Sequence, residues 1–244
     1  MAIKTRKSRY FEYEERIRRS YHDLKRAYDE VQDSYAEMVF RLALVAEYKD
    51  DSTGTHLVRI ADYSTEIARE MGLSQKDINY LKYASVMHDI GKLVVPDAIL
   101  KKASGLTPEE REVVKKHAAL GADIFKGSHS PLLKVAKLIC LTHHERYDGT
   151  GYPNGLKGKN IPLFGRIVAI ADVFDALTSA RPYNEAYGFE EALLMIKVQS
   201  GKHFDPDVVK VFLKCKNKIK KIWQATRDID SFVKEKAQEQ TVES

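Results

Sequence analysis

Histidine and aspartate residues gather at a few points of this 244-residue chain, and both residue types bind transition metals. The pair His88-Asp89 closes one apolar segment, and the pair His143-His144 closes another. Asp172 interrupts a third apolar run. Because burying an ionised carboxylate alone is very costly, an aspartate in such a run must be paired or metal-bound. The pattern therefore favours a buried metal site.

The two adjacent pairs favour two metal ions over one. Neighbouring residues on a helix point about 100° apart, so each member of a pair reaches a different ion. Together with isolated histidines and aspartates, the pairs supply seven candidate ligands: His56, His88, Asp89, His117, His143, His144 and Asp172. Seven exceed what one tetrahedral zinc needs. They suit a hydrolytic site in which two ions lie about 3.5–4 Å apart.

Taken singly, several of these histidines are more typical of structural or exposed positions. His56 stands near an expected helix start, and His117 stands within an expected helix. Only the whole constellation favours a ligand role for them. Mixed imidazole and carboxylate ligands suit iron, manganese or zinc, which leaves the identity of the metal open.

Helical patterns must position these residues, because strand signals are nearly absent. Gly54 is the first glycine and Pro96 the first proline, so the first quarter of the chain can be nearly continuous helix. The sequence Thr107-Pro108-Glu109-Glu110 is the strongest helix start, with a cap, a proline and a capping-box glutamate. The fold class predicted is all-α, with helices near 10–48, 53–71, 75–89, 108–126, 131–146, 162–179, 189–200, 206–224 and, at the end, 227–238.

The N-terminal segment carries an apolar seam in alternating steps of four and three residues. Its members are Ile17, Tyr21, Leu24, Tyr28, Val31, Tyr35, Met38, Leu42 and Val45. Such a heptad repeat predicts a parallel coiled coil and therefore a homodimer. The alternative is a long amphipathic helix that folds back on its own domain.

A glycine-rich segment stands between two apolar helices. Residues 145–160 hold four glycines between Gly149 and Gly158. This composition predicts a long, mobile surface loop, where functional residues concentrate.

Composition excludes several classes of protein. The net charge of +5 suits an anionic ligand, and it is too small to argue for a DNA or RNA polymer. No run approaches 18 apolar residues, so no membrane span is expected. The basic N-terminus lacks the apolar stretch of a secretory signal. Cys140 and Cys215 lie far apart, which favours free thiols and a cytoplasmic location.

Two motifs in order resemble the HD-GYP domain, a branch of the HD metal-dependent phosphohydrolases. They are His88-Asp89-Ile90-Gly91-Lys92 and Gly151-Tyr152-Pro153. Further matching stretches are His143 to Pro153, Ala171 to Thr178, Arg181-Pro182-Tyr183 and His203-Phe204-Asp205-Pro206. The resemblance runs from about Asp50 to Phe212, and the intervals between the candidate ligands match as well as the motifs do.

The resemblance implies a helical HD core with extra helices, and it implies hydrolysis of the bacterial second messenger cyclic di-GMP. It also implies that Asp89 bridges two metal ions, iron or manganese, and that the other six ligands divide between them. Some members hold a third metal on a glutamate four residues before the first histidine, a position that is Ser52 here. A third metal is therefore not expected. The domains predicted are 1–48, a dimerising helix; 49–224, the catalytic domain; and 225–244, a C-terminal helix or tail.

Residues near the motifs have expected roles in catalysis and substrate binding. Lys92 lies one turn after His88 and can stabilise developing negative charge on a phosphate oxygen. Tyr152 can donate a hydrogen bond to the same phosphate, and Arg181 offers a planar fork for phosphate or guanine. Asp175, three residues after Asp172, is expected to support a metal-bound histidine. Gly151, Pro153 and Asp50 complete the set expected to contact substrate. Each of these residues has a non-functional alternative: Lys92 and Arg181 can be ordinary surface residues, and Tyr152 can be part of a turn.

The resemblance, together with the two-metal ligand set, implies a cyclic di-GMP phosphodiesterase that forms linear pGpG, with onward hydrolysis to GMP left open. One alternative is a catalytically slow cyclic di-GMP receptor or interaction module. Another is a hydrolase of a different cyclic dinucleotide. The basic residue that the family often carries after Arg-Pro-Tyr is Asn184 here, which weakens one expected substrate contact. A separate sensor or signalling protein is an expected partner of the N-terminal helix.

Overall fold

The computed structural model describes residues 2–50, 54–102, 105–179 and 186–226. Within these ranges the chain is helical and contains no β-sheet, which confirms the all-α prediction. The chain forms two compact units, Met1–Arg41 and Leu42–Ser244. No helix in the described ranges is both long and apolar enough to cross a membrane.

The first unit consists of most of helix α1, Ala2–Glu47, which begins earlier than expected. Its apolar seam is uncovered in the single chain: Ile17, Leu24 and Val31 are 63%, 70% and 64% exposed. Flanking charges form pairs one turn apart, such as Arg41 with Glu37. The helix is therefore present as predicted, while its pairing in a coiled coil stays a prediction.

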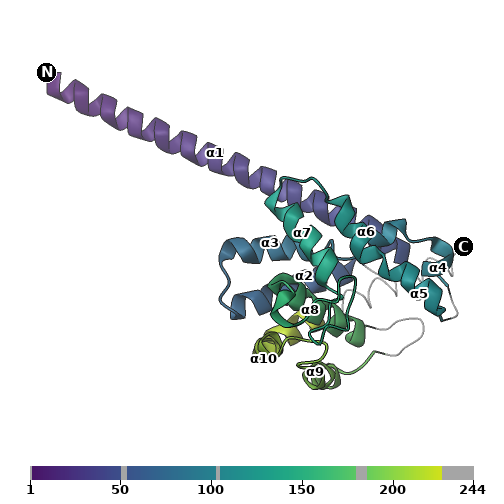
Figure 1. Ribbon diagram of the computed structural model, residues 1–244. Coiled ribbons are helices and arrows are strands. Elements are labelled where there is room, and N and C mark those ends of the chain that lie inside the picture. Colours follow the sequence, from purple (N-terminus) through teal and green to yellow (C-terminus); the bar gives the residue numbers. More distant parts are fainter. Residues whose placement is uncertain (1, 51–53, 103–104, 180–185, 227–244) are drawn as a thin grey trace, which may run out of the picture. The chain divides into compact units, whose positions relative to one another are not determined.

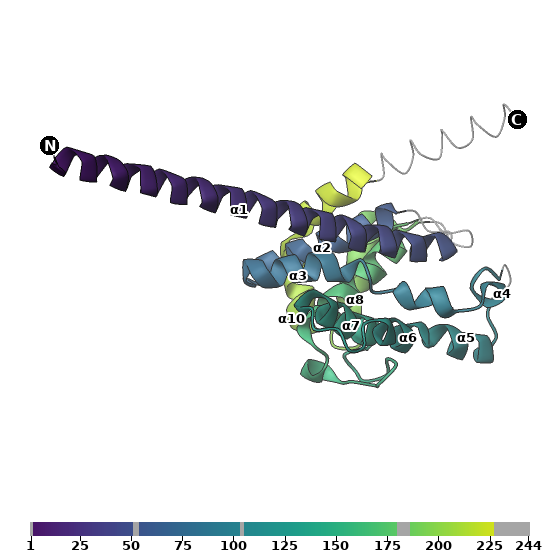
Figure 2. The ribbon, with the colours of Figure 1, turned by 90° about the horizontal axis from the view of Figure 1, so that it is seen from above.

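The second unit begins with the last turn of α1 and contains the remaining elements (Figure 1). Helix α2 packs between α3 and α8, and α7 packs against α3, α6 and α8 (Figure 2). Helices α9 and α10 cover another side of α8. The elements are η1 (Tyr48–Asp50), α2 (Thr55–Glu70), α3 (Gln75–Ser85), η2 (Ile90–Val94), α4 (Asp97–Leu100), α5 (Pro108–Lys115), α6 (His117–Ile124), α7 (Pro131–Thr142), η3 (Gly158–Asn160), α8 (Leu163–Thr178), α9 (Phe189–Val198) and α10 (Pro206–Lys214).

An aromatic cluster joins these helices around α8. The Phe174 ring meets the rings of Tyr63, Phe189 and Phe212 edge-on at centroid distances of 5.4, 5.6 and 5.2 Å. All four side chains are buried. Edge-to-face pairs at this distance contribute beyond their buried area, so α2, α8, α9 and α10 form one rigid support.

Two expected helices end four residues earlier than the sequence pattern indicates. The helix expected over 75–89 ends at Ser85, and the one expected over 131–146 ends at Thr142. Hydrogen bonds of the tighter 3₁₀ type follow Ser85, from His88 N to Ser85 O and from Lys92 N to Asp89 O. The pairs His88-Asp89 and His143-His144 therefore lie just beyond helix ends, where their side chains can turn inward.

The expected helix over 108–126 is two helices, α5 and α6, separated at Lys116. The capping box of Thr107 and Glu110 is present as predicted. The break lies beside His117, whose Nδ1 lies 2.7 Å from the carbonyl of Val114. The expected helix over 206–224 also breaks, at Cys215, and resumes over 216–226. The expected helix over 227–238 lies outside the described residues.

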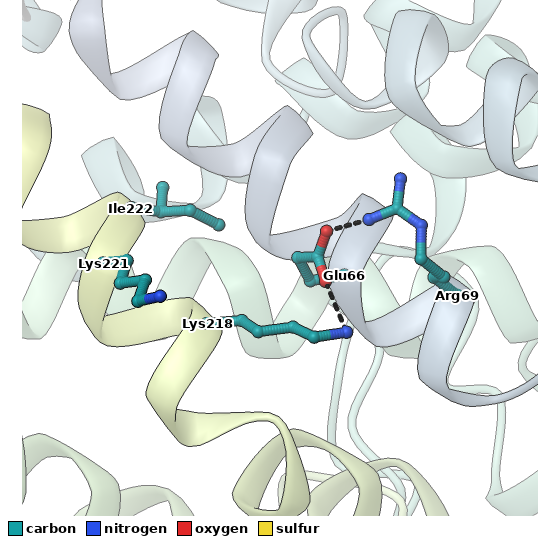
Figure 3. A pocket seen from close by; sticks show the side chains of 5 residues that line it. All are labelled: Glu66, Arg69, Lys218, Lys221 and Ile222. Carbon is teal, nitrogen blue, oxygen red and sulfur yellow. Dashed lines mark hydrogen bonds and ion pairs between the residues drawn. The ribbon is translucent and has the colours of Figure 1, made fainter.

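Lysines of the C-terminal segment pair with acidic residues of α2. Lys214 lies 2.7 Å from Glu70, and Lys218 lies 3.2 Å from Glu66. Figure 3 shows Glu66 between Arg69 and Lys218 in a shallow pocket that Lys221 and Ile222 complete. At a rise of 1.5 Å per residue, this pocket lies about 15 Å along α2 from His56, so it is separate from the histidine cluster.

Gly91 marks the closest approach between η2 and α6. A Cβ at this position would lie 1.9 Å from the carbonyl oxygen of His117 and 2.5 Å from the amide nitrogen of Gly121. Both neighbours are backbone atoms, which cannot move without displacing α6. A glycine is therefore required at the position between Asp89 and Lys92.

We expect Gly91→Ala to lower the stability of the fold by about 3 kcal/mol or more, because the added methyl overlaps backbone. For a chain of this size the loss corresponds to a fall in Tm of about 6–12 °C, measured by thermal unfolding. Gly105→Ala is the matched control, because a Cβ there meets nothing within 4 Å. Equal Tm values for the two variants would contradict the packing argument.

Candidate metal centre

The structure brings all seven predicted ligand residues together in two neighbouring groups. Asp89, His117, His143 and His144 form one group, and His56, His88 and Asp172 form the other. Within each group the candidate ligand atoms all lie within 4.8 Å of one another. The residues come from α2, α6, α8 and the segments after α3 and α7. The helix packing described above therefore converges on this cluster.

Backbone carbonyls hold three of the histidine rings in one orientation. The Nδ1 atoms of His88, His117 and His143 lie 2.9, 2.7 and 3.1 Å from the carbonyl oxygens of the residues three positions earlier. An Nδ1–H that donates to a carbonyl leaves the lone pair on Nε2. Such bonds fix the tautomer that a metal ligand requires.

Asp89 lies between the two groups and faces both. Its Oδ1 lies 3.1 Å from His117 Nε2 and 3.4 Å from His143 Nε2. Its Oδ2 lies 3.4 Å from His88 Nε2 and 2.8 Å from Lys92 Nζ. Each carboxylate oxygen thus points to the histidines of a different group.

Two buried atoms at the centre, His88 Nε2 and Asp89 Oδ1, make no hydrogen bond within the described part of the chain, because the Nε2 atoms that face Asp89 carry lone pairs and cannot donate. Unsatisfied buried polar atoms are costly, and a bound ion relieves that cost. Nitrogen and carboxylate oxygen donors match the preferences of iron, manganese and zinc. The residues present therefore fit divalent metal ions.

Charge in the cluster is arranged to attract cations. Burial alone would lower the pKa of His88, but the carboxylates of Asp89 and Asp172 raise it to about 9. Burial alone would raise the pKa of Asp89, but Lys92 and His88 hold it well below its usual range. Burial keeps the pKa of His144 well below its ordinary value, so this imidazole is neutral. The carboxylates of Asp89 and Asp172 thus act on the neighbouring groups of this cluster, which is the electrostatic setting for a cation.

Asp175 and Arg59 support the second group from α8 and α2. The Nδ1 of His56 lies 2.7 Å from Asp175 Oδ2. Arg59 donates to both carboxylate oxygens of Asp175 and also to Ser179. Burial alone would raise the pKa of Asp175, but these partners lower it, so the carboxylate is ionised and orients His56. The structure thus places Asp175 where the sequence predicted it.

Tyr152 and Gly151 bring the glycine-rich segment against the first group. The Tyr152 ring stacks on His144 at a centroid distance of 4.7 Å. Burial, with the charges of Asp89 and Asp172, raises the pKa of the Tyr152 phenol, which therefore keeps its proton. A Cβ on Gly151 would lie 2.3 Å from the amide nitrogen of Arg146, so this glycine serves close packing.

Glu145 was not singled out in the sequence, although it holds this segment in place. It is 2% exposed, and its two oxygens accept hydrogen bonds from the amides of Asn154 and Leu156 at 2.7 and 2.9 Å. The amide of Asp148 adds a bond to the carbonyl of Lys202. The segment is thus tied at several points, which differs from the mobile loop expected. The signal available in the sequence was a glutamate directly after the histidine pair, at the start of a glycine-rich segment whose backbone amides need acceptors.

Glu47 is a second residue that sequence reasoning missed. It is the last residue of α1 and 3% exposed. Burial raises the pKa of its carboxyl, and the charges of His56, Asp89 and His88 act on it. The available signal was spacing, because Glu47 follows the apolar residues Val39 and Ala43 at intervals of four, on one face of the helix.

Several predicted residues lie outside the described residues or at their edge. Ser52, Arg181 and Asn184 lie outside the described residues, and Asp50 is described only as the last backbone residue of η1. Pro153 follows Tyr152 in the tied segment. The substrate contacts expected of these residues stay predictions.

We expect Asp175→Asn to weaken metal binding by about 10–100-fold, because an amide cannot orient the His56 imidazole as the carboxylate does. The measurement is a metal titration of chelator-treated protein by competition with an indicator. Asp123→Asn, an exposed aspartate of α6, is the control. Equal affinity in both variants, with the metal-free Tm unchanged, would show that Asp175 does not support the site.

Comparisons with known proteins agree with this geometry. The family model described as "HD domain" matches residues 37–208. A cyclic di-GMP phosphodiesterase of Thermotoga maritima is 43% identical over 204 residues, which cover 84% of this chain and 55% of that protein. A 3'3'-cGAMP-specific phosphodiesterase 2 of Vibrio cholerae is 40% identical over 184 residues, covering 75% of this chain and 35% of that protein.

A solved structure shows the same fold. The crystal structure of a cyclic GMP-AMP-specific phosphodiesterase of V. cholerae has a TM-score of 0.58 and 21% identity, covering 79% of this chain and 53% of that one. The present chain thus spans about half or less of the length of these relatives. Because the matched span 37–208 contains both ligand groups, from His56 to Asp172, the chain belongs to the HD domain family.

Proposed function

We propose that this chain is a metal-dependent phosphodiesterase that hydrolyses cyclic di-GMP to linear pGpG. The observation that carries the proposal is the pair of ligand groups, in which Asp89 of the first group also faces His88 of the second. Two divalent ions held by these groups, iron or manganese, would lower the pKa of a water and polarise a phosphoryl oxygen. The relatives named above support a cyclic dinucleotide as the substrate class.

Protein side chains supply the remaining chemistry. Lys92 Nζ, held 2.8 Å from Asp89, places a positive charge beside the cluster, where a non-bridging phosphate oxygen gains negative charge. Tyr152 keeps its proton and can donate it in a hydrogen bond to the same phosphate. His56 and Asp175 keep the second group oriented without reorganisation during the reaction.

A specific observation favours a second candidate substrate, 3'3'-cGAMP, because one of the relatives is named for it. Cyclic di-GMP and 3'3'-cGAMP differ in one purine base, so base contacts must discriminate between them. Arg181 is the residue of this chain that we expect to contact guanine. The third candidate function is that of a receptor, which binds cyclic di-GMP and does not hydrolyse it.

The test is anaerobic purification, metal analysis, and chromatography of the products from cyclic di-GMP and 3'3'-cGAMP. We expect about two metal ions per chain and pGpG that accumulates without GMP. His88→Ala should lower the rate by at least about 100-fold, since it removes one ligand and leaves Asp89 uncompensated. His129→Ala, an exposed histidine after α6, should leave the rate unchanged.

Each outcome selects one candidate. Faster hydrolysis of 3'3'-cGAMP would replace the substrate and keep the reaction. Two metal ions and bound cyclic di-GMP without turnover would favour the receptor. Equal rates in the two histidine variants would refute the proposed centre.

We also propose that α1 forms a dimer through its apolar seam. Burying side chains such as Leu24 and Val31 removes apolar surface from water, which is the driving force of a coiled coil. We propose that a separate sensor protein binds this helix. We also propose that the protein is cytoplasmic.

The double variant Leu24→Glu/Val31→Glu should convert a dimer to a monomer, because it places like charges in the seam. Light scattering reports the mass. His22→Glu, off the seam, is the control and should remain dimeric. A monomeric parent chain, or a dimeric double variant, would exclude this seam as the interface.

A further inference from the structure

Lys49, in the turn that follows α1, makes three contacts with the segment after the metal centre. Its Nζ lies 2.7 Å from the carbonyl oxygen of Leu93 and 2.6 Å from that of Val95. It also lies 3.2 Å from the carboxylate of Asp97. An ammonium has three donors, so these acceptors match its whole capacity.

The segment that Lys49 holds is η2, which carries Lys92. The first half of η2 is fixed by packing, because Gly91 lies against the backbone of α6. The second half lacks such cover: Leu93 and Val94 are 39% and 57% exposed. A cation at the carbonyl end of a short helix is favourable, so Lys49 stabilises the half of η2 that packing leaves open.

Lys92 sits at the junction of these halves. Its amide donates to the carbonyl of Asp89, and its own carbonyl accepts from the amide of Val95. Lys49 holds the next carbonyl, that of Leu93, and so limits the backbone angles that aim Lys92 at Asp89. Glu47, two residues before Lys49, is buried where the charges of His56 and Asp89 act on it. One turn of chain therefore contacts both the cluster side and the η2 side.

We propose that Lys49 is a positioning residue that holds η2 so that Lys92 reaches the metal centre, which makes the end of α1 a control point for activity. The inference rests on the proposed phosphodiesterase function and adds to it a residue that acts only through Lys92. Displacement of the last turn of α1 would release the Leu93 and Val95 carbonyls, and with them Lys92.

The first experiment does not depend on activity. Hydrogen exchange is measured on the full chain for the peptide that covers residues 89–97, in Lys49→Met and in Lys101→Met. Lys101 is exposed at the end of α4 and serves as the matched control. We expect faster exchange at Lys92 and Val95 in Lys49→Met alone, because their amide bonds lie within the clamped turn. Equal exchange in the two variants would overturn the proposal, even for a chain that hydrolyses nothing.

The second experiment is a double-mutant cycle on kcat for cyclic di-GMP. We expect Lys49→Met to lower kcat by about 10–100-fold with unchanged metal content, as a small misplacement of a catalytic group does. Lys49→Arg, which keeps a cationic donor, should restore most of the rate. In a Lys92→Met background, Lys49→Met should cost nothing further. The same loss with and without Lys92 would show that Lys49 acts elsewhere and would overturn the proposal. A parent chain without turnover would instead count against the proposed function.

Discussion

The arrangement of the helices around the metal centre depends on the buried carboxylate of Asp89. An ionised group in that position costs several kcal/mol unless other charges balance it. Lys92 Nζ lies 2.8 Å from this carboxylate, and the rings of His88, His117 and His143 surround it from three separate segments. The helices must therefore end where these side chains can reach one point, and the early ends of α3 and α7 follow from that requirement.

The same local hydrogen bond orients the rings of three histidines, His88, His117 and His143. In each case the histidine ring bonds to the carbonyl of the residue three positions earlier, at or beside a helix terminus. Carbonyls at helix ends lack helical partners, so they are available to orient a ring without breaking a helix bond. His56 differs, because Asp175 orients it from α8. Helix α8 packs against α2, so a carboxylate of α8 reaches the His56 ring.

The sequence was sufficient for the helical class and for the seven residues that converge on one cluster, for a physical reason. Carboxylates and histidines placed in apolar runs have few stable outcomes other than a metal site. The capping box at Thr107 was equally readable, because its partners lie within three residues. The break at Lys116 was not, since nothing local marks it and a distant backbone, that of Gly91, packs beside it. Glu145 and Lys49 escaped notice for the same reason, as both bind backbone groups that the pattern does not show.

The sides of the metal centre are held by contacts of different kinds and therefore differ in rigidity. The aromatic cluster around Phe174 and the Arg59–Asp175 pair fix the side of the site that α2 and α8 build. Glu145 fixes the segment that carries Tyr152 through two buried hydrogen bonds. The side formed by η2 is buried at Ile90 and Gly91, whereas its outer half, Leu93 and Val94, is exposed and is held by the ammonium of Lys49. Exposed polar contacts open more readily than buried apolar ones, so a signal that alters this centre meets the least resistance at η2.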